Sequence, residues 1–383
     1  MLAALLLLSW ALGIVGDGVP LTMLDAASYP NARCLDGSQA GYYFQPASTP
    51  DASSKWVIYL NGGGECASEE SCLAQTTSAL GSSKYFSESV DANGWYLASD
   101  YCPYNPDFCG YNHVFDPYCS QDLHSGQRAT PSPASFNLSF SGHHILANTL
   151  DHLDTTANLT LATEILLTGT SAGGLGVWMN VDYVAARYPK ARVTAVTIAG
   201  FYFYATYYTG ENATAPGMAD FRVEAWDSTY DLYNAYVDES CREFYEKGGN
   251  SPSACMTANQ SWAHVGADSF AVQSQTDQTV LTGHDCWPSN YMSQSPESAF
   301  MAQWHANMTT ALAPLMRHSP LSPRSGVFAA ACYIHGGFTH SSPIIEGFNY
   351  FQAVGNFYFE RTPPSGYKLA DDCGEMCNPT CPV

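Results

Sequence analysis

The segment around Ser171 constrains the fold most, because it combines an apolar strand, a tight turn and a helical pattern. Residues 164–168 read as a short buried strand, and residues 174–188 carry apolar side chains at helical spacing up to Pro189. The turn between them, residues 169–173, matches the pattern Gly-x-Ser-x-Gly. A serine at such a strand–turn–helix junction exposes its hydroxyl and needs small neighbours. Ser171 is therefore a candidate nucleophile, and the alternative is an ordinary glycine-rich turn.

Short apolar strands alternate with helical patterns along the rest of the chain. We expect strands at residues 55–60, 164–168, 193–199, 269–273 and 327–334, and helices at residues 145–153, 174–188 and 298–316. Continuous apolar strands between helices predict an α/β fold with a mostly parallel central sheet and helices on both faces. The sequence contains no linker, repeat or low-complexity block, so we expect a single domain over residues 17–383.

The N-terminus has the pattern of a secretory signal peptide. Residues 2–12 are almost entirely apolar but too few to span a bilayer, and Gly13 and Gly16 offer cleavage points. No later run of the sequence is long and apolar enough for a membrane helix. We therefore expect a signal peptide over residues 1–16 and a secreted, soluble mature protein without a membrane span.

The thirteen cysteines fit an oxidising compartment and allow up to six disulfides with one odd thiol. Cys66 and Cys72 are close enough in sequence to close a short loop. Cys373, Cys377 and Cys381 crowd the C-terminus, where we expect them to hold the end of the chain. A zinc cluster is the alternative there, and the lack of a histidine beside these cysteines disfavours it. We therefore expect no metal and no cofactor.

The chain is strongly acidic, with 35 Asp and Glu residues against 14 Lys and Arg residues and a net charge of −21. This balance argues against nucleic-acid binding, which needs a basic surface to neutralise phosphates. Strong affinity for a polyanion is also disfavoured outside a local patch. Five sequons favour a glycosylated surface, and they stand at Asn137, Asn158, Asn212, Asn259 and Asn307.

A glycine-rich loop follows the strand predicted at residues 55–60, at the edge where active sites gather in parallel sheets. Three consecutive glycines expose backbone N–H groups, which suits an oxyanion hole. In hydrolases of the doubly wound class, such a loop and the residue after the serine each supply one N–H. We expect the donors at Gly63, Gly64 and Ala172, and the alternative is a loop that only turns the chain.

Asp277 lies a few residues beyond the strand predicted at residues 269–273, where the acid of a catalytic triad belongs. Asp268 and Asp285 compete for this role. Asp268 begins the strand, at its wrong end, and Asp285 lies far beyond the strand. Position therefore favours Asp277.

His335 follows the strand predicted at residues 327–334 and is the candidate general base and acid. The order serine, aspartate, histidine is that of the α/β-hydrolases. His340 is a rival five residues further on, and position directly after the strand favours His335. His143 and His144 precede the elbow, and we expect them to be structural or on the surface.

Taken in order, these stretches resemble the pectin acetylesterase and Notum family of serine carboxylesterases. The matching stretches are Cys34-Leu35-Asp36-Gly37-Ser38, Gly41-Tyr42-Tyr43-Phe44, Tyr59-Leu60-Asn61-Gly62-Gly63-Gly64 with Cys66 and Cys72, Tyr118-Cys119 with Ser125-Gly126, Gly169-Thr170-Ser171-Ala172-Gly173-Gly174, Ala199-Gly200-Phe201, Asp277 and Cys332-Tyr333-Ile334-His335. The resemblance implies an α/β-hydrolase-like fold and hydrolysis of carboxylic esters through an acyl-enzyme. It implies the roles of nucleophile, acid and base for Ser171, Asp277 and His335, and of oxyanion donors for Gly63, Gly64 and Ala172.

Three positions depart from the family's pattern. Glu65 stands where the family usually has an aromatic residue, Ile198 where it usually has an acid, and Gly336 where plant members have a cysteine. The position of Glu65 belongs to the rim of the implied site. The substrate is therefore what the resemblance leaves most open.

Members of the family remove acetyl groups from pectin or palmitoleate from secreted signalling proteins. Aromatic residues at 201–204, Tyr207 and Tyr208 either line an apolar pocket or pack in the core. We favour an acetylesterase-like enzyme that acts on an acylated polysaccharide or another extracellular ester. A deacylase of a lipidated secreted protein and a catalytically inactive secreted binding protein are the alternatives. A disulfide-rich structural glycoprotein would not need the glycine loop and the elbow in register.

Overall fold

A ten-stranded sheet forms the centre of the protein in a computed structural model, which describes residues 18–214, 223–288, 299–317 and 324–382. The signal peptide predicted at residues 1–16 lies outside the described residues. The strands are β1 (Val19–Met23), β2 (Gly41–Gln45), β3 (Lys55–Leu60), β4 (Ser89–Val90), β5 (Asn112–Asp116), β6 (Glu164–Thr170), β7 (Arg192–Ile198), β8 (Asp268–Ser274), β9 (Ser325–Ala330) and β10 (Lys368–Ala370). The helices are α1 (Glu69–Gln75), α2 (Gly142–Thr156), α3 (Ala172–Arg187), α4 (Val223–Tyr233), α5 (Glu239–Lys247), α6 (Ala258–Ser261), α7 (Ala299–Met316) and α8 (Tyr350–Tyr358).

The strand order is β10-β9-β8-β7-β6-β3-β5-β2-β1-β4. The strands from β10 to β5 all pair in parallel, whereas β2, β1 and β4 add an antiparallel edge. The predicted mostly parallel sheet is therefore confirmed. Its antiparallel edge is formed by short strands that we did not predict.

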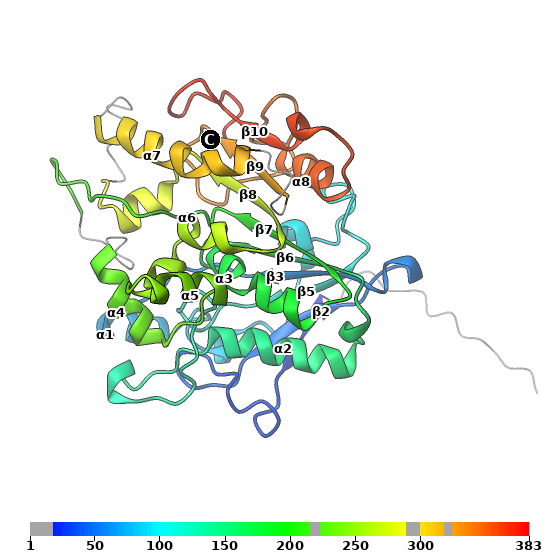
Figure 1. Ribbon diagram of the computed structural model, residues 1–383. Helices are drawn as coiled ribbons and strands as arrows, with labels where there is room; N and C mark the ends of the chain where they lie inside the picture. Colours follow the sequence, from blue (N-terminus) through cyan, green and yellow to red (C-terminus); the bar gives the residue numbers. More distant parts are fainter. Residues whose placement is uncertain (1–17, 215–222, 289–298, 318–323, 383) are drawn as a thin grey trace, which may run out of the picture.

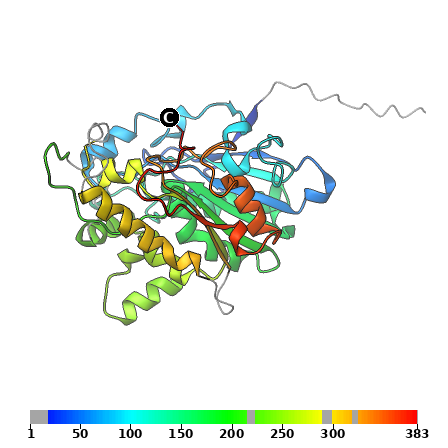
Figure 2. The same ribbon diagram turned by 90° about the horizontal axis from the view of Figure 1, so that it is seen from above.

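Helices cover both faces of this sheet, and Figures 1 and 2 show the strands in the middle of the molecule. Side chains of β3 alternate between two cores: Trp56 and Ile58 belong to one, and Val57 and Tyr59 to the other. Residues of α2, α3 and α7 complete the first core. Residues of α8, among them Phe357, complete the second.

The predicted elements differ from the structure mainly at their ends. The elbow strand and helix nearly meet, because β6 continues to Thr170 and α3 already begins at Ala172. The strand predicted at residues 327–334 was wrong in its second half, since β9 ends at Ala330. There the chain turns out of the sheet, with Cys332 N–H donating to the Ala330 carbonyl at 2.9 Å. His335 therefore follows a turn and not the strand itself.

Six disulfides cross-link the fold, the largest number that thirteen cysteines allow. They join Cys34 to Cys119, Cys66 to Cys72, Cys102 to Cys109, Cys241 to Cys255, Cys332 to Cys381 and Cys373 to Cys377. The thirteenth cysteine, Cys286, is a buried thiol. All three C-terminal cysteines are thus used in disulfides, which removes the thiolates that the zinc alternative requires.

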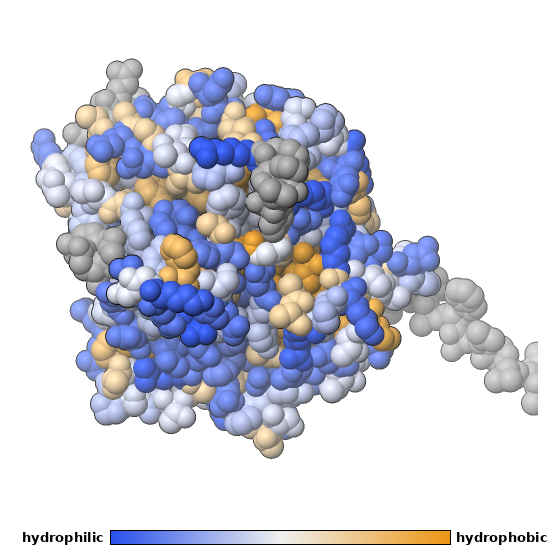
Figure 3. Space-filling model, viewed as in Figure 1, coloured by the Kyte–Doolittle hydropathy of each residue, from blue (hydrophilic) through white to orange (hydrophobic). Residues whose placement is uncertain are grey.

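The surface is mostly polar, and most of the sequon asparagines lie on it. The face in Figure 3 is mostly hydrophilic, with small separated hydrophobic areas. Of the sequon asparagines, Asn137, Asn158, Asn212 and Asn307 are exposed, while Asn259 is half-buried. Among the described residues, no helix is both long enough and apolar enough to cross a membrane.

Candidate active site

Ser171 lies in the tight turn between β6 and α3, and its backbone conformation is strained. Its φ and ψ are 58° and −123°, a conformation that a non-glycine residue adopts only under the constraint of its surroundings. The Ser171 N–H donates to the Ile198 carbonyl at 2.9 Å, and the Leu175 N–H donates to the Ser171 carbonyl at 3.1 Å. Strand and helix together hold the serine in this conformation, as the predicted elbow requires.

The glycines around the serine let three backbone segments meet. A Cβ on Gly173 would collide with the Leu60 carbonyl at the end of β3, and a Cβ on Gly62 would collide with the Thr170 carbonyl. The start of the glycine loop therefore packs directly against the elbow. Small residues are required here by contact between backbones, and not only by the turn itself.

Ser171 and His335 line one cavity of about 360 Å³. The cavity is also lined by Tyr59, Asn61, Gly62, Gly63, Gly64, Tyr96, Thr170, Thr279 and Gly336. The expected oxyanion donors Gly63 and Gly64 thus face the same space as the serine. Ala172, the third, begins α3, where backbone N–H groups lack partners within the helix.

His335 is bound to Asp277. Its Nδ1 lies 2.8 Å from Oδ1 and 2.9 Å from Oδ2 of Asp277, whose side chain is fully buried. The carboxylate also accepts the backbone N–H groups of Thr279 and Val280, at 3.0 and 3.1 Å. Gln273 Nε2 donates to Asp277 Oδ2 at 2.9 Å. This arrangement orients the imidazole with its Nδ1 toward the acid.

The competing acids lie elsewhere. Asp268 forms an ion pair with Arg324 at 2.7 Å. It lies at the start of β8, as we expected, and therefore at the opposite end of the strand from Asp277. Asp285 is buried and accepts the Trp304 indole N–H at 2.7 Å. Neither carboxylate is placed against His335 by these contacts.

The other candidate histidines also have different surroundings. His340 is exposed and stacks on Tyr104, with ring centroids 3.6 Å apart. His143 is buried, with Nδ1 2.7 Å from Asn180 Oδ1, and burial lowers its pKa to about 4. His144 lies near the Gln127 carbonyl, with Nε2 at 3.2 Å.

The glycine loop is held in place by the segment that follows β5. Gln121 Nε2 donates to the Gly63 carbonyl at 3.2 Å, and the Cys66 N–H donates to the Gln121 carbonyl at 3.2 Å. His124 Nε2 lies 2.8 Å from the Asn61 carbonyl. Gly64 adopts φ of 73° within this loop. The His124 side chain therefore holds the start of the loop, the Gln121 side chain its centre and the Gln121 backbone its end, and we predicted neither residue.

This supporting segment is itself unusual. Gln121, Leu123 and His124 all adopt positive φ, between 54° and 59°. Burial lowers the pKa of His124 to about 4, so the ring is neutral and donates from Nε2 to the loop. Asn180 Nδ2 of α3 donates to the His124 carbonyl at 3.0 Å. His124 thus links the glycine loop to the helix that begins after Ser171.

One side of the serine is polar and buried. Tyr202 Oη lies 3.4 Å from Ser171 Oγ, and its ring centroid lies 5.8 Å from that of His284. His284 Nδ1 lies 3.5 Å from Glu65 Oε1, and both side chains are only 1% exposed. The aromatic residues 201–203 are all buried, so this stretch packs in the core. Within it, Tyr202 also reaches the site.

Sequence reasoning missed Gln273, Gln121 and His124, and it considered Tyr202 only as part of an aromatic stretch that lines a pocket or packs in the core. Gln273 left a signal, because it is a polar residue directly after the apolar run Phe270-Ala271-Val272 of β8. Gln121 and His124 gave none, since their contacts are with a loop that is distant in sequence. In the part of the chain that the structure describes, no group of three His, Cys, Asp or Glu side chains is arranged to hold a metal ion.

Comparisons with known proteins identify relatives of the whole chain. The model of the family described as "Pectinacetylesterase" matches residues 15–382. Pectin acetylesterase 5 of Arabidopsis thaliana is 29% identical, over 95% of this chain and 85% of the relative. The palmitoleoyl-protein carboxylesterase NOTUM of Schmidtea mediterranea is also 29% identical, over 84% of this chain and 61% of the relative.

A solved structure shares the fold. The Wnt deacylase Notum from Drosophila superposes with a TM-score of 0.77 at 25% identity. The match covers 96% of this chain and all of the other. The α/β-hydrolase-like architecture expected from the sequence is thereby confirmed.

Proposed function

We propose that this chain, which belongs to the pectinacetylesterase family, is a secreted serine esterase that hydrolyses acetyl esters on an extracellular polymer. One observation carries the proposal. Ser171, in a strained elbow, shares a cavity with His335, whose Nδ1 is bound to the buried Asp277. Two segments more than 150 residues apart in sequence converge there, as the family's chemistry requires.

The reaction follows from the positions of these groups. Ser171 Oγ attacks the ester carbonyl while His335 Nε2 takes the hydroxyl proton. Asp277 stabilises the resulting imidazolium, and the N–H groups of Gly63, Gly64 and Ala172 receive the carbonyl oxygen as it becomes an oxyanion. The ester C–O bond then breaks, and the imidazolium gives its proton to the departing alcohol.

Water completes the turnover. His335 removes a proton from a water molecule, which attacks the acyl group on Ser171. The acyl–serine bond breaks, the serine regains the proton, and a carboxylic acid leaves. No metal or cofactor enters any of these steps.

The buried polar side of the site favours a short acyl group. We expect a long apolar chain that extends past Tyr202 to meet the buried polar side chains of His284 and Glu65, and contact between polar groups and an apolar chain is unfavourable. The relatives named pectin acetylesterases, which this chain matches over 95% of its length, support the same choice.

Secretion is supported by the disulfides. Six disulfides in one chain persist in an oxidising compartment, such as the cell exterior. The net charge of −21 disfavours a polyuronate, so a neutral acetylated polysaccharide is the substrate that we favour.

The test is hydrolysis of p-nitrophenyl esters from acetate to octanoate. We expect wild-type kcat/KM to be highest for acetate, and Ser171→Ala to lower kcat for acetate by about 10⁴- to 10⁶-fold, because it removes the nucleophile. Ser341→Ala changes an exposed serine in the loop after His335 and serves as the matched control. Equal rates for wild type and Ser171→Ala would refute the mechanism, and a maximum at octanoate would refute the acetyl preference.

A further inference from the structure

A second pocket, of about 380 Å³, lies between the loop that carries Tyr104, the loop that carries His340 and the first turns of α8. We propose that this pocket binds a neutral sugar ring of the substrate polymer, an inference that rests on the proposed function. The pocket does not share a lining residue with the cavity at Ser171. It is therefore a separate binding site and not an extension of the catalytic one.

Aromatic rings form an exposed platform in this pocket. The rings of Tyr104 and His340 are nearly parallel, with centroids 3.6 Å apart and an interplanar angle of 7°. Tyr101 meets Tyr104 edge-on, with centroids 4.6 Å apart. Tyr104 is 43% exposed, and Tyr101, which does not itself line the pocket, is 41% exposed. A flat ring with a polar edge suits a pyranose, whose C–H face is apolar and whose rim is polar.

The platform is fixed before any ligand arrives. Asn349 Nδ2 donates to the His340 carbonyl at 2.6 Å, which ties that loop to α8. Asn349 also caps α8, because its N–H donates to Gln352 Oε1 and its Oδ1 accepts the Gln352 N–H. Rings held in this way lose little freedom when a ligand stacks on them, which lowers the entropic cost of binding.

The charges in the pocket favour a neutral ligand. Arg361 binds Asp107 through two hydrogen bonds of 2.6 and 2.8 Å, so the pair is neutral as a whole. The Arg361 side chain is 47% exposed and keeps edges that face solvent. The pair offers a donor and an acceptor to sugar hydroxyls, while the guanidinium already has its carboxylate. A uronate would have to compete with Asp107 on a chain of net charge −21.

The two pockets are close enough for one polymer chain to occupy both. His340 follows His335 by five residues, so their Cα atoms are at most about 18 Å apart. Between them, Gly336 accepts the Tyr96 hydroxyl at 2.7 Å, which fixes this connection to the wall of the catalytic cavity. An oligosaccharide of a few rings spans such a distance.

The binding test uses the inactive Ser171→Ala protein, so that the probe is not consumed. Affinity electrophoresis in gels that contain acetylated glucomannan measures its affinity for a neutral polymer. We expect Tyr104→Ala in this background to weaken binding about tenfold, because the stacking face is lost. Tyr104→Phe keeps the ring and retains binding within about threefold. Tyr85→Ala removes another tyrosine, 54% exposed and outside this pocket, and leaves binding unchanged.

Kinetics with active protein give a second readout. Tyr104→Ala raises KM for acetylated glucomannan about tenfold, whereas its hydrolysis of p-nitrophenyl acetate stays within twofold of wild type. Unchanged glucomannan affinity in Tyr104→Ala overturns the proposal, and so does tighter binding of polygalacturonate than of glucomannan. Hydrolysis of p-nitrophenyl acetate by wild type tests the proposed function separately, since that small ester does not reach this pocket.

Discussion

At the scale of single residues, Asp116 is a buried acid outside the catalytic cavity. It ends β5, is fully buried, and neither carboxyl oxygen has a hydrogen-bond partner in the described part of the chain. Burial, together with the nearby charge of Asp122, raises the pKa of Asp116 to about 8. Asp116 therefore carries a proton at neutral pH. Its backbone carbonyl accepts the Asn61 N–H at 3.1 Å, which places this neutral acid directly behind the glycine loop.

Asp116 should make the protein less stable as the pH rises. In the unfolded chain its proton leaves near the ordinary value of 3.8, whereas the folded protein keeps it up to about pH 8. Between these values the folded state binds more protons, so stability falls by at most about 1.4 kcal/mol per pH unit from this group. Asp116→Asn removes the contribution. We expect denaturant midpoints of wild type and variant to diverge from pH 5 to pH 7, with the variant gaining. Parallel pH profiles would contradict this pKa.

At the scale of elements, the glycine loop depends on the strained segment beneath it. A loop of three glycines has no side chains of its own to hold its shape, and its backbone has many accessible conformations. Gln121 and His124 supply the missing contacts at Gly63 and Asn61. The positive φ values of these residues are the strain that this support requires. His124 is therefore a positioning residue for the expected oxyanion hole.

Replacing His124 should slow the reaction without weakening substrate binding. We expect His124→Ala to lower kcat for p-nitrophenyl acetate about 10- to 100-fold with KM within twofold, because misplaced donors act on the transition state. His124→Gln keeps an N–H donor at similar reach and should recover most of the rate. His143→Ala is the matched control, since His143 is also buried and also contacts Asn180 but not the loop. An equal loss of kcat in both alanine variants would show a general structural effect.

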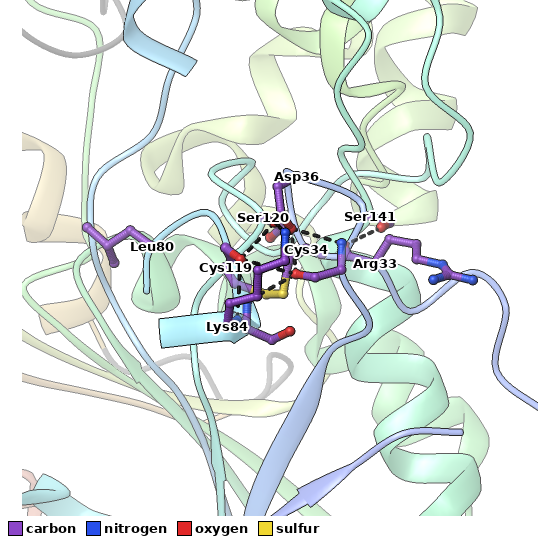
Figure 4. Close-up of a disulfide and its surroundings, with 12 residues drawn as sticks. Arg33, Cys34, Asp36, Leu80, Lys84, Cys119, Ser120 and Ser141 are labelled. Carbon is purple, nitrogen blue, oxygen red and sulfur yellow. Dashed lines mark hydrogen bonds and ion pairs between the residues drawn. A yellow bond between two sulfur atoms is a disulfide. The ribbon is translucent and has the colours of Figure 1, made fainter. Parts of the chain in front are cut away.

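At the scale of the whole molecule, disulfides tie distant segments to the sheet. Cys34–Cys119 joins the N-terminal region to the segment after β5, across 85 residues. Figure 4 shows the polar contacts around it, including the Lys84–Asp36 ion pair at 2.9 Å and the Ser141 hydroxyl that donates to the Arg33 carbonyl at 2.7 Å. The same region lies next to Tyr118 and the supporting segment. The disulfide is therefore close in sequence to Gln121 and His124, which hold the glycine loop.

Removal of this disulfide should lower the free energy of unfolding more than removal of a disulfide that closes a short loop. In the chain-entropy model, opening the 85-residue loop costs about 4.6 kcal/mol and opening the 7-residue Cys102–Cys109 loop about 2.4 kcal/mol. We therefore expect Cys34→Ser with Cys119→Ser to lower the denaturant midpoint more than Cys102→Ser with Cys109→Ser. The comparison is made by urea unfolding under non-reducing conditions. The reverse order would show that loop entropy does not govern these disulfides.

The sequence by itself determined the fold class and the order of the candidate site residues. Apolar runs recur wherever a strand is buried on both faces, so β3, β6, β7 and β8 could be predicted with nearly correct ends. Ser171, Gly63 and Asp277 could be selected because local patterns mark the ends of such strands. The disulfide count followed from composition and compartment.

The tertiary structure decided what depends on contacts between distant segments. It placed His335 against Asp277, 58 residues away in sequence, and His340 on Tyr104. Position along the chain favoured His335 over His340 but could not decide between them. The tertiary structure also brought Tyr202 to Ser171, and Gln121 and His124 to the glycine loop. Local periodicity reports how a segment is buried, whereas hydrogen-bond partners are fixed only when the packed sheet brings its loops together.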